Sequence, residues 1–350
     1  MKNFKVATDI VPEERQTAID RALHETFSTT ELDSFQRITI GNMTSRVFRI
    51  VVNGSTYILK IILRKDDPTC HFNCMNVAAK AGLAPRVLYA NIEDKVCITD
   101  FVNTIPLSAD AALTRIPQTL RQLHALPLFP NRAPHLNTTF TFLLNEGPAL
   151  DAFIERIQAA SFLPDRAGFV ARLGELSAAF PREDSDIVSS HNDLFKPDNV
   201  LFDGRQIWLV DWEAAFRNDR YVDLAVVANM IVTTEAEEST FLQEYFGAPP
   251  NVYQRARLFL ARQLAHMFYA AAFLMLGSIG KPIDWAEPIP AYADVQRRFW
   301  SSELALNDHE SKLVFGKTHL KRFQDNLDTP RLAQAMKFVS ASAAKRGALD

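Results

Sequence analysis

The chain has 350 residues, 47% of them hydrophobic, and is long enough to build a packed core in two or more domains or lobes. Its formal net charge of -3 argues against a generally basic, nucleic-acid-binding surface. The three cysteines, Cys70, Cys74 and Cys97, show no CxxC spacing, and their odd number fits a reducing compartment better than a disulfide framework. Residues 1–14 are polar and lack the apolar run of a secretory signal, so we expect a cytoplasmic protein with no nucleic-acid partner.

The first predicted elements are a helix over residues 12–27 and a β-hairpin. The apolar segments 47–52 and 55–62 are separated only by Asn53-Gly54, which is the strongest short-range hairpin signal. A two-residue turn pairs Val52 with Ser55 and places Lys60 opposite Val47. The hairpin therefore carries Lys60 back beside the polar, glycine-started stretch GNMTSR that precedes it.

A helix is predicted over residues 70–81, ended by Gly82. Cys70, His71 and Cys74 on this helix could be interpreted as a metal cluster. No second ligand pair follows them in the sequence, so small buried thiols are the preferred interpretation.

The character of the chain changes near Val102. Two strands are predicted around Glu93-Asp94, whereas helical periodicity dominates residues 113–126, 149–160 and 166–180. This change predicts an N-terminal lobe of residues 1–102, with the sheet, and a helical C-terminal lobe of residues 103–350.

A second hairpin is predicted around Asp203-Gly204, between the apolar segments NVLF and RQIWLVDW. That turn would place Asn199 opposite Trp208 and leave Asp211 three positions farther along, so the ends of the hairpin would have to converge beyond the ladder. We expect Asp203 to be a solvated turn residue.

The rest of the chain is predicted to be helical over residues 221–232, 235–246 and 252–276, with further helices beyond Pro290. Its most apolar stretch, residues 258–276, is interrupted by Arg262 and His266. We therefore expect a buried helix, not a membrane span, and no membrane partner.

Four side chains around these hairpins have the chemistry that phosphoryl transfer needs. Mg²⁺ prefers carboxylate and amide oxygens, a separate carboxylate must act on the attacking hydroxyl, and a cation must hold the phosphates. Asp193, Asn199, Asp211 and Lys60 could fill these positions.

The segment that carries these residues resembles the catalytic core of the aminoglycoside phosphotransferase and choline kinase family. The similarity consists of His191-Asn192-Asp193, then Asn199, and then an apolar hairpin that leads into Asp211-Trp212-Glu213. NDRYVDLA is similar to the family's segment after the metal aspartate, and GNMTSRVFRI, ITDFV and TLRQLHALP resemble its phosphate-covering turn, hinge and following helix. The resemblance spans roughly residues 35–275.

The resemblance implies a role for each residue of the core. It makes Asp193 the catalytic base, and Asn199 and Asp211 the Mg²⁺ ligands, with Glu213 assisting. Lys60 would hold the α- and β-phosphates of ATP.

Further contacts follow from the same resemblance. Nucleotide contacts would come from the covering turn, with Gly41, Thr44 and Ser45, and from the backbone near Asp100 and Val102. Asp223 would brace the catalytic loop from within, and His191 is expected to be structural.

The catalytic loop departs from the family's pattern in its length. The family places its asparagine five residues after the catalytic aspartate, but here Asp198 takes that position and Asn199 comes sixth. Two registers are open. Because the following strand is fixed by its hairpin, we expect the extra residue to be absorbed between Leu194 and Asp198, with Asn199 on the metal.

The lysine also departs from the pattern. The family pairs it with a glutamate on the next helix, but residues 64–81 contain no glutamate, and Asn73 and Asn76 are the nearest polar candidates. An amide supplies no negative charge, so we expect Lys60 to lack a glutamate partner in the nucleotide-free protein.

These observations predict an α+β, two-lobed, protein-kinase-like fold with a small antiparallel sheet and a larger helical lobe. The predicted function is an ATP- and Mg²⁺-dependent small-molecule kinase that phosphorylates an alcohol group. A nucleotide-binding pseudokinase and, less favoured, a protein kinase are the alternatives. The acceptor could be a choline-like amino alcohol, an aminoglycoside or a sugar. A cationic acceptor could use these acidic or aromatic side chains, each of which is more often a core residue: Trp212, Tyr245, Tyr269, Trp285, Glu287 and Trp300.

Overall fold

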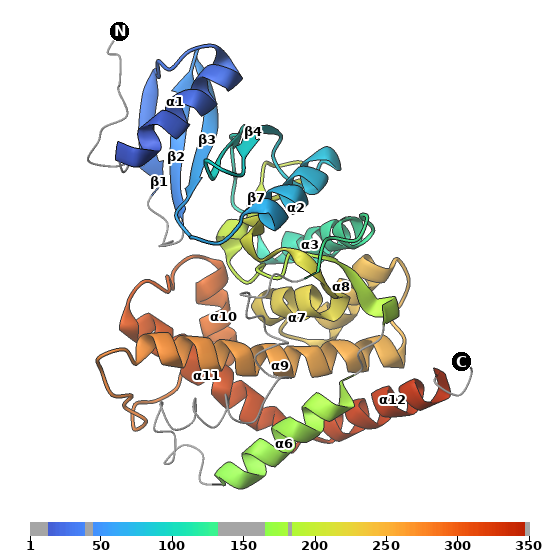
Figure 1. Ribbon diagram of the computed structural model, residues 1–350. Helices are drawn as coiled ribbons and strands as arrows, with labels where there is room; N and C mark the ends of the chain where they lie inside the picture. The colour runs from blue at the N-terminus through green and yellow to red at the C-terminus, as the bar shows by residue number, and fades with distance from the viewer. Residues whose placement is uncertain (1–12, 39–44, 132–164, 181–183, 347–350) are drawn as a thin grey trace. The chain divides into compact units, whose positions relative to one another are not determined.

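The computed structural model describes residues 13–38, 45–131, 165–180 and 184–346. The chain divides into two compact units (Figure 1). The first, here called the sheet unit, comprises Met1–Pro106, Leu126–Asn131 and Asp198–Phe216. The second, the helical unit, comprises Leu107–Ala125, Arg132–Pro197 and Arg217–Asp350.

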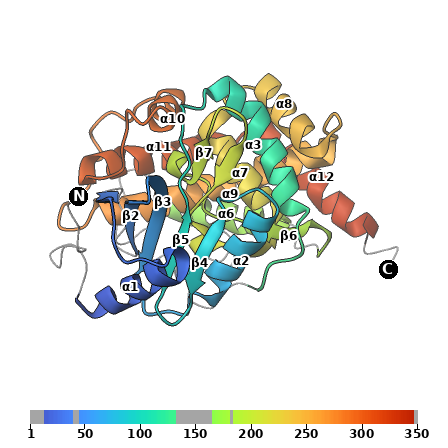
Figure 2. The ribbon, with the colours of Figure 1, turned by 90° about the horizontal axis from the view of Figure 1, so that it is seen from above.

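The sheet unit contains a five-stranded antiparallel sheet with the strand order β1-β2-β3-β5-β4. Helix α1 packs against β4 and β5 (Figure 2). The elements in chain order are α1 (Glu13–Phe27), β1 (Ser34–Ile38), β2 (Ser45–Val52), β3 (Ser55–Ile62), α2 (Thr69–Lys80), β4 (Val87–Asn91) and β5 (Val96–Asp100).

The predicted first hairpin is confirmed residue by residue. Val52 pairs with Ser55, and Val47 pairs with Lys60. Asn53 and Gly54 have φ values of 50° and 76°, and two central residues with positive φ are what a tight hairpin turn requires.

The sheet presents one face to a core and the other face to the site. Leu59 and Ile61 are fully buried in the core cluster, together with Phe48 and Ile50 of the neighbouring strand. Side chains of successive strand residues point to opposite faces, so Lys60 lies on the other face from Leu59 and Ile61. The pattern of apolar residues therefore fixes which way Lys60 points.

The second hairpin, β7 (Val200–Phe202) and β8 (Ile207–Leu209), corrects the sequence prediction. Phe202 pairs with Ile207, so the register is two residues away from the predicted one. Gly204, with φ of 95°, takes the first central position of the turn in place of the second. The Asp203 carboxylate accepts hydrogen bonds from the backbone N–H groups of Arg205 and Gln206 and from the Trp208 indole, which stabilise this turn.

The helical unit follows the predicted helices closely, although the expected helix over residues 149–160 lies outside the described residues. It also contains two short strands, β6 (Ile187–Ser190) and β9 (Phe216–Asp219), that form a small sheet. Its helices are α3 (Ala109–His124), α6 (Arg166–Ala179), α7 (Arg220–Ile231), α8 (Glu235–Phe246), α9 (Val252–Gly277), α10 (Tyr292–Trp300), α11 (His309–Leu327) and α12 (Pro330–Arg346).

Helix α9 forms the centre of this unit and runs beside α11 (Figure 1). In the described part of the chain it is the helix long and apolar enough to cross a membrane, but 83% of its most apolar window is buried inside the protein. The prediction of a buried core helix agrees with this burial.

The starts of α8 and α9 are fixed by local capping. Thr234 and Glu237 form a capping box at α8, as do Asn251 and Gln254 at α9. Each box satisfies backbone N–H groups that the first helical turn leaves without acceptors, which explains why these boundaries were predictable.

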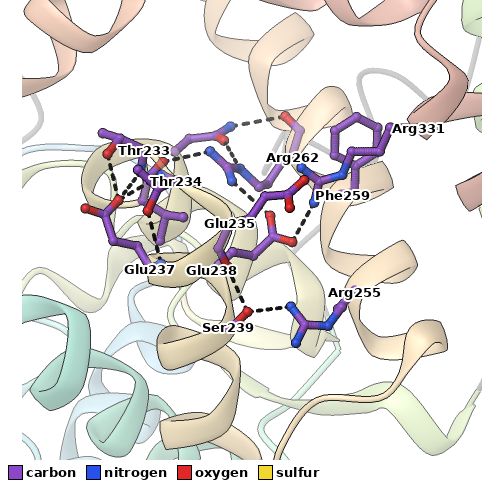
Figure 3. Close-up of polar contacts among 12 residues, drawn as sticks. Thr233, Thr234, Glu235, Glu237, Glu238, Ser239, Arg255, Phe259, Arg262 and Arg331 are labelled. Atoms are coloured by element: carbon purple, nitrogen blue, oxygen red, sulfur yellow. Dashed lines mark hydrogen bonds and ion pairs between the residues drawn. The ribbon is translucent and has the colours of Figure 1, made fainter.

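A buried charge network joins α8, α9 and α12 (Figure 3). Glu238 of α8, with 2% of its surface exposed, accepts hydrogen bonds from Arg262 of α9 at 3.3 Å and Arg331 of α12 at 2.5 Å. Arg262 also donates to Asn229 and to the carbonyl of Val232. Burying a carboxylate requires such partners, so the network ties α12 to the centre of the unit.

A pair of histidines is buried between α9 and α11. The Nδ1 atoms of His266 and His319 lie 3.1 Å apart, so one ring must donate and the other accept. Burial, with the neighbouring His319, Arg262 and Arg322, holds the pKa of His266 well below its usual range. Burial also lowers the pKa of His319 to about 3.

This pair predicts a specific loss of stability in mild acid. The unfolded chain protonates these histidines near pH 6.5, whereas the folded chain keeps them neutral until the pH falls towards their depressed pKa values. The free energy of unfolding should therefore fall as pH drops below about 6.5, by up to about 1.4 kcal/mol per pH unit for each histidine. His319→Phe should reduce this slope in denaturant titrations between pH 6.5 and 5.

His24→Gln is the matched control, because His24 is exposed on α1. Equal slopes for the wild-type protein and both variants would refute the assignment of this acid sensitivity to the buried pair.

Candidate functional site

Lys60 lies between two carboxylates of the segment that follows β8. Its Nζ is 2.8 Å from Oδ1 of Asp211 and 2.9 Å from Oε1 of Glu213, and the three side chains are 12%, 19% and 11% exposed. The second carboxylate oxygen of Glu213 lies 3.4 Å from Arg64. The expectation that Lys60 lacks a glutamate partner is therefore wrong. Helix α2 has none, but Glu213, distant in sequence, supplies the charge.

The electrostatics of this group favour a charged lysine. Burial by itself would lower the pKa of Lys60, but the negative charges and hydrogen bonds of Asp211 and Glu213 raise it above its ordinary value. Lys60 is consequently a fixed cation in this environment.

A tight turn places the two carboxylates on the same lysine. Asp211 adopts the left-handed backbone conformation, with φ of 66°, and begins a 3-10 turn over Trp212–Ala214. Trp212, the residue between Asp211 and Glu213 in the sequence, is buried. It donates its indole N–H to the carbonyl of Leu209 at 3.1 Å, and its ring packs edge-on with that of Phe129. The buried tryptophan anchors the turn, so Asp211 and Glu213 both face Lys60.

Asn199 enters the same unit at the start of β7. It is 4% exposed, and its carbonyl accepts a hydrogen bond from the N–H of Val210 at 3.1 Å. The corrected hairpin register thus brings Asn199 opposite Val210, directly before Asp211. Asp198, in the 3-10 turn Pro197–Asn199, is exposed. The hairpin therefore directs Asn199 inward and Asp198 outward.

The Asn199 amide and the Asp211 carboxylate are donors of the kind that a hard divalent cation takes. Over the described ranges, no three His, Cys, Asp or Glu side chains are grouped closely enough to form a metal cluster by themselves. A cation there would need oxygens from a bound phosphate or from water in addition to Asn199 and Asp211. The weaker interpretation of Cys70, His71 and Cys74 as a metal cluster is likewise not supported in the described chain.

Asp193 belongs to the helical unit, in a loop that is held from behind. Asp223 of α7 accepts the backbone N–H groups of His191 at 2.9 Å and Asn192 at 2.7 Å. The prediction that Asp223 braces this loop is confirmed. Asp193 itself is partly exposed, with Nζ of Lys196 at 3.8 Å.

Two further residues support Asp223, and the sequence analysis did not identify them in this role. His124 of α3 lies 3.2 Å from Oδ2 of Asp223 through Nε2, and 2.7 Å from the hydroxyl of Tyr245 through Nδ1. Burial would raise the pKa of Asp223, but its hydrogen bonds and the neighbouring histidines lower it, so the brace remains a carboxylate. The motif LHALP contains His124 but gives no sign of this contact.

Aromatic side chains surround the residue two positions after Asp193. Phe195 packs on Tyr269 at 5.0 Å, on Phe273 at 5.8 Å, and stacks on Phe299 at 6.0 Å between ring centroids. Burial and the charge of Asp193 raise the pKa of Tyr269 well above its usual range. Among the candidates for an acceptor pocket, Tyr269 is therefore the one whose pKa is raised by the charge of Asp193.

Four of the other acceptor candidates have structural partners. Trp212 and Tyr245 are buried by the contacts above, Trp300 donates to the carbonyl of Leu107, and Glu287 pairs with Lys317 at 3.0 Å. None of these contacts indicates a ligand.

The predicted nucleotide contacts are partly described. Gly41 and Thr44 lie outside the described residues, and Ser45 is buried at the start of β2 opposite Ile62. The N–H of Asp100 donates to the carbonyl of Arg86, and its carboxylate pairs with the same arginine. The Asp100 N–H is therefore already engaged and is not available to a base. Val102 follows two residues after the end of β5.

The chain matches a family model described as the phosphotransferase enzyme family over residues 34–259. It is 25% identical over 260 residues to Protein LicA of Haemophilus influenzae, a match that covers 69% of this chain and 70% of that protein.

Solved structures with this fold include a choline/ethanolamine kinase family protein from Mesorhizobium loti, with 18% identity, a TM-score of 0.64, and coverage of 93% of this chain and 99% of that one. Choline kinase LicA from Streptococcus pneumoniae has 16% identity, a TM-score of 0.58, and coverage of 90% and 99%. The spectinomycin phosphotransferase APH(9)-Ia, solved with ADP and spectinomycin, has 12% identity, a TM-score of 0.54, and coverage of 87% and 98%. The predicted protein-kinase-like fold class is confirmed by these similarities.

The unexpected Lys60–Glu213 pair leads to a prediction that can be tested without knowing the substrate. In Glu213→Gln, Lys60 loses one of its two negative neighbours, so its pKa should fall and a larger fraction should be the neutral, nucleophilic amine. At pH 8 its acylation by acetic anhydride should be about tenfold faster, measured by peptide mapping relative to exposed Lys80 in the same molecule.

Glu93→Gln is the control, because Glu93 is an exposed acid of the same unit on the β4–β5 turn. If Lys60 reacted equally in the two variants, Glu213 would not be the residue that raises its pKa.

Proposed function

Because the chain belongs to the phosphotransferase enzyme family, we propose that it transfers the γ-phosphate of ATP, with Mg²⁺, to a hydroxyl group of a small molecule. The family and its relatives support a small-molecule kinase with an alcohol group as acceptor. The observation that carries the proposal is the position of Lys60 between Asp211 and Glu213.

Asp193 is the proposed base. Its carboxylate would orient the acceptor hydroxyl and accept its proton as the oxygen attacks phosphorus. The bonds from Asp223 to the backbone of residues 191 and 192 support this role, because they fix the loop without using the Asp193 side chain.

Lys60 is the proposed phosphate ligand. Asn199 and Asp211 would hold Mg²⁺, which neutralises charge on the transferred phosphate. Asp211 would then be engaged by the metal, and Glu213 would remain to orient Lys60. Since the two oxygens of Glu213 face Lys60 and Arg64, we assign it this orienting role in preference to metal ligation.

The acceptor that we propose is a choline-like amino alcohol or an aminoglycoside. Relatives named choline kinase and spectinomycin phosphotransferase support these two classes. The ammonium of Lys196 lies 5.6 Å from the centroid of the Phe195 ring, so this ring, two residues after Asp193, would suit a cationic group by cation–π attraction.

A panel of hydroxylated amines tests the function. ADP release should be stimulated by choline, ethanolamine or an aminoglycoside in the presence of Mg²⁺, and phosphate should appear on the hydroxyl of the product by mass spectrometry. If the protein bound ATP tightly but no acceptor of the panel stimulated ADP release, a protein that only binds nucleotide would be favoured instead.

Asp193→Asn should reduce turnover by about 10²–10⁴-fold while Mg-ATP affinity stays nearly unchanged, because base removal affects the chemical step and not nucleotide contacts. ADP release and titration calorimetry measure the two quantities. Asp198→Asn, an exposed acid in the same loop, is the matched control and should keep near wild-type turnover. Full turnover in Asp193→Asn would refute the base assignment.

The metal position predicts a ranking of two alanine variants. Asn199→Ala should raise the Mg²⁺ concentration for half-maximal ADP release by about tenfold or more, the equivalent of ~1.4 kcal/mol. Asp198→Ala should raise it only mildly, because Asp198 is exposed and Asn199 is buried. The reverse ranking would identify Asp198 as the ligand.

A further inference from the structure

Helix α2 carries two cysteines that the proposed function does not use. Cys70 and Cys74 are one helical turn apart, and their sulfur atoms lie 4.0 Å from each other. Both thiols also approach one acceptor, the carbonyl oxygen of Ala215, at 3.5 and 3.6 Å. Two thiols that converge on one point in the same unit can react with each other.

The Cα separation permits a bond between them, but the helix must distort for the Cβ atoms to approach. Residues four apart on a helix have Cβ atoms about 5–6 Å apart, whereas a disulfide needs about 3.5–4.5 Å. In an ideal α-helix the Cα atoms of residues i and i+4 are about 6.2 Å apart, from the rise and radius of the helix. This separation lies inside the range of roughly 4.4–6.8 Å that disulfides span. The sulfurs would have to approach each other by about 2 Å.

That movement would fall on the start of α2. Cys70 is the second residue of the helix, whose N-cap residue Pro68 makes no side-chain capping hydrogen bond. The turn is held instead by Asp67, which accepts from the Thr69 N–H and hydroxyl at 2.9 and 2.6 Å, so the oxidised form would strain these bonds.

The two thiols differ in exposure and in pKa, as do a cysteine that reacts with an oxidant and the resolving cysteine that then forms the disulfide. Cys70 is half-buried near the N-terminus of a 12-residue helix, where the helix dipole favours a thiolate. The hydrogen bond with Cys74 lowers the pKa of Cys70 to about 7. Cys74 is buried, and its pKa is raised by the same hydrogen bond and by burial, so it remains protonated.

We propose that Cys70 and Cys74 form a reversible redox modification site that takes a peroxide as its oxidant. The Cys70 thiolate attacks one peroxide oxygen, the O–O bond breaks, and Cys70 becomes a sulfenic acid while hydroxide leaves. The sulfur of Cys74 then attacks the sulfur of Cys70. The hydroxyl leaves with the thiol proton as water, and a disulfide forms. Two electrons pass from the sulfurs to the peroxide, and a dithiol reverses the reaction.

The location of the pair gives the oxidation a consequence for turnover, which rests on the proposed function. Ala215 follows two residues after Glu213, which pairs with Lys60. A disulfide leaves no thiol proton for the Ala215 carbonyl to accept, and it displaces the Cys70 side chain on the first turn of α2. The segment that positions Glu213 is thereby loosened, and turnover is lost in proportion to the oxidised fraction.

The sequence makes the disulfide simple to detect. Lys65 and Lys80 bound a tryptic peptide, residues 66–80, that contains both cysteines, while Cys97 falls in another peptide. After treatment with hydrogen peroxide and alkylation under denaturing conditions, this peptide should be lighter by two hydrogen atoms and carry no alkyl group. Dithiothreitol should restore two alkylated cysteines and the lost turnover.

Three variants complete the test. Cys97→Ser should behave like the wild-type protein, Cys70→Ser should not lose two hydrogen atoms, and Cys74→Ser should accumulate a sulfenic acid at Cys70 that dimedone traps. Melting temperatures establish that each variant is folded, with Cys70→Ala as the replacement for Cys70→Ser if that variant is not. Two alkylatable cysteines after peroxide treatment, or a disulfide that involves Cys97, would overturn the proposal.

If the reduced protein released no ADP with any acceptor, the proposed function would fail, and the mass of the peptide would still decide whether the modification site exists. If the oxidised protein kept full turnover, the link to Glu213 would be wrong.

Discussion

A lysine ammonium held between two carboxylates is the constraint on which the sheet unit depends. Taking three charged groups largely out of water is favourable only when they remain close and hydrogen-bonded. Lys60 must therefore leave β3 on the face opposite Leu59 and Ile61, and Asp211 must accept a left-handed backbone. The burial of Trp212 provides the rigid support that this backbone conformation needs.

The two hairpins differ in what determines their register. Asn53-Gly54 can place two residues with positive φ only at the centre of a turn, so its register was determined locally. Asp203-Gly204 contains the same signal, but the Asp203 carboxylate prefers to accept from the two N–H groups that follow the glycine. This capping moves the turn by one residue and the pairing by two. A shift by two residues keeps every side chain on its predicted face, and for this reason the error did not displace Asn199 from the interior.

Contacts between residues distant in sequence leave no local signal that would predict them. The family resemblance points to α2 for the partner of Lys60, whereas Asp211 and Glu213 lie about 150 residues farther along the chain. His124, Tyr245 and the pair of His266 and His319 have no local pattern at all. Their contacts form only when packed helices bring these residues together. By contrast, the helix boundaries at α8 and α9 were predictable because their capping boxes are local.

The way in which Asp223 holds its loop has a consequence for how such a protein can change during evolution. Its two oxygens bind backbone N–H groups, which every residue except proline possesses, and His124 and Tyr245 support it from α3 and α8. The shape of the loop is therefore encoded separately from the side chains that the loop displays. Substitutions among Phe195 and its aromatic neighbours can therefore change the surface beside Asp193 without moving the backbone that carries it. A protein built in this way can vary the side chains around this loop by ordinary point mutations while the loop keeps its shape.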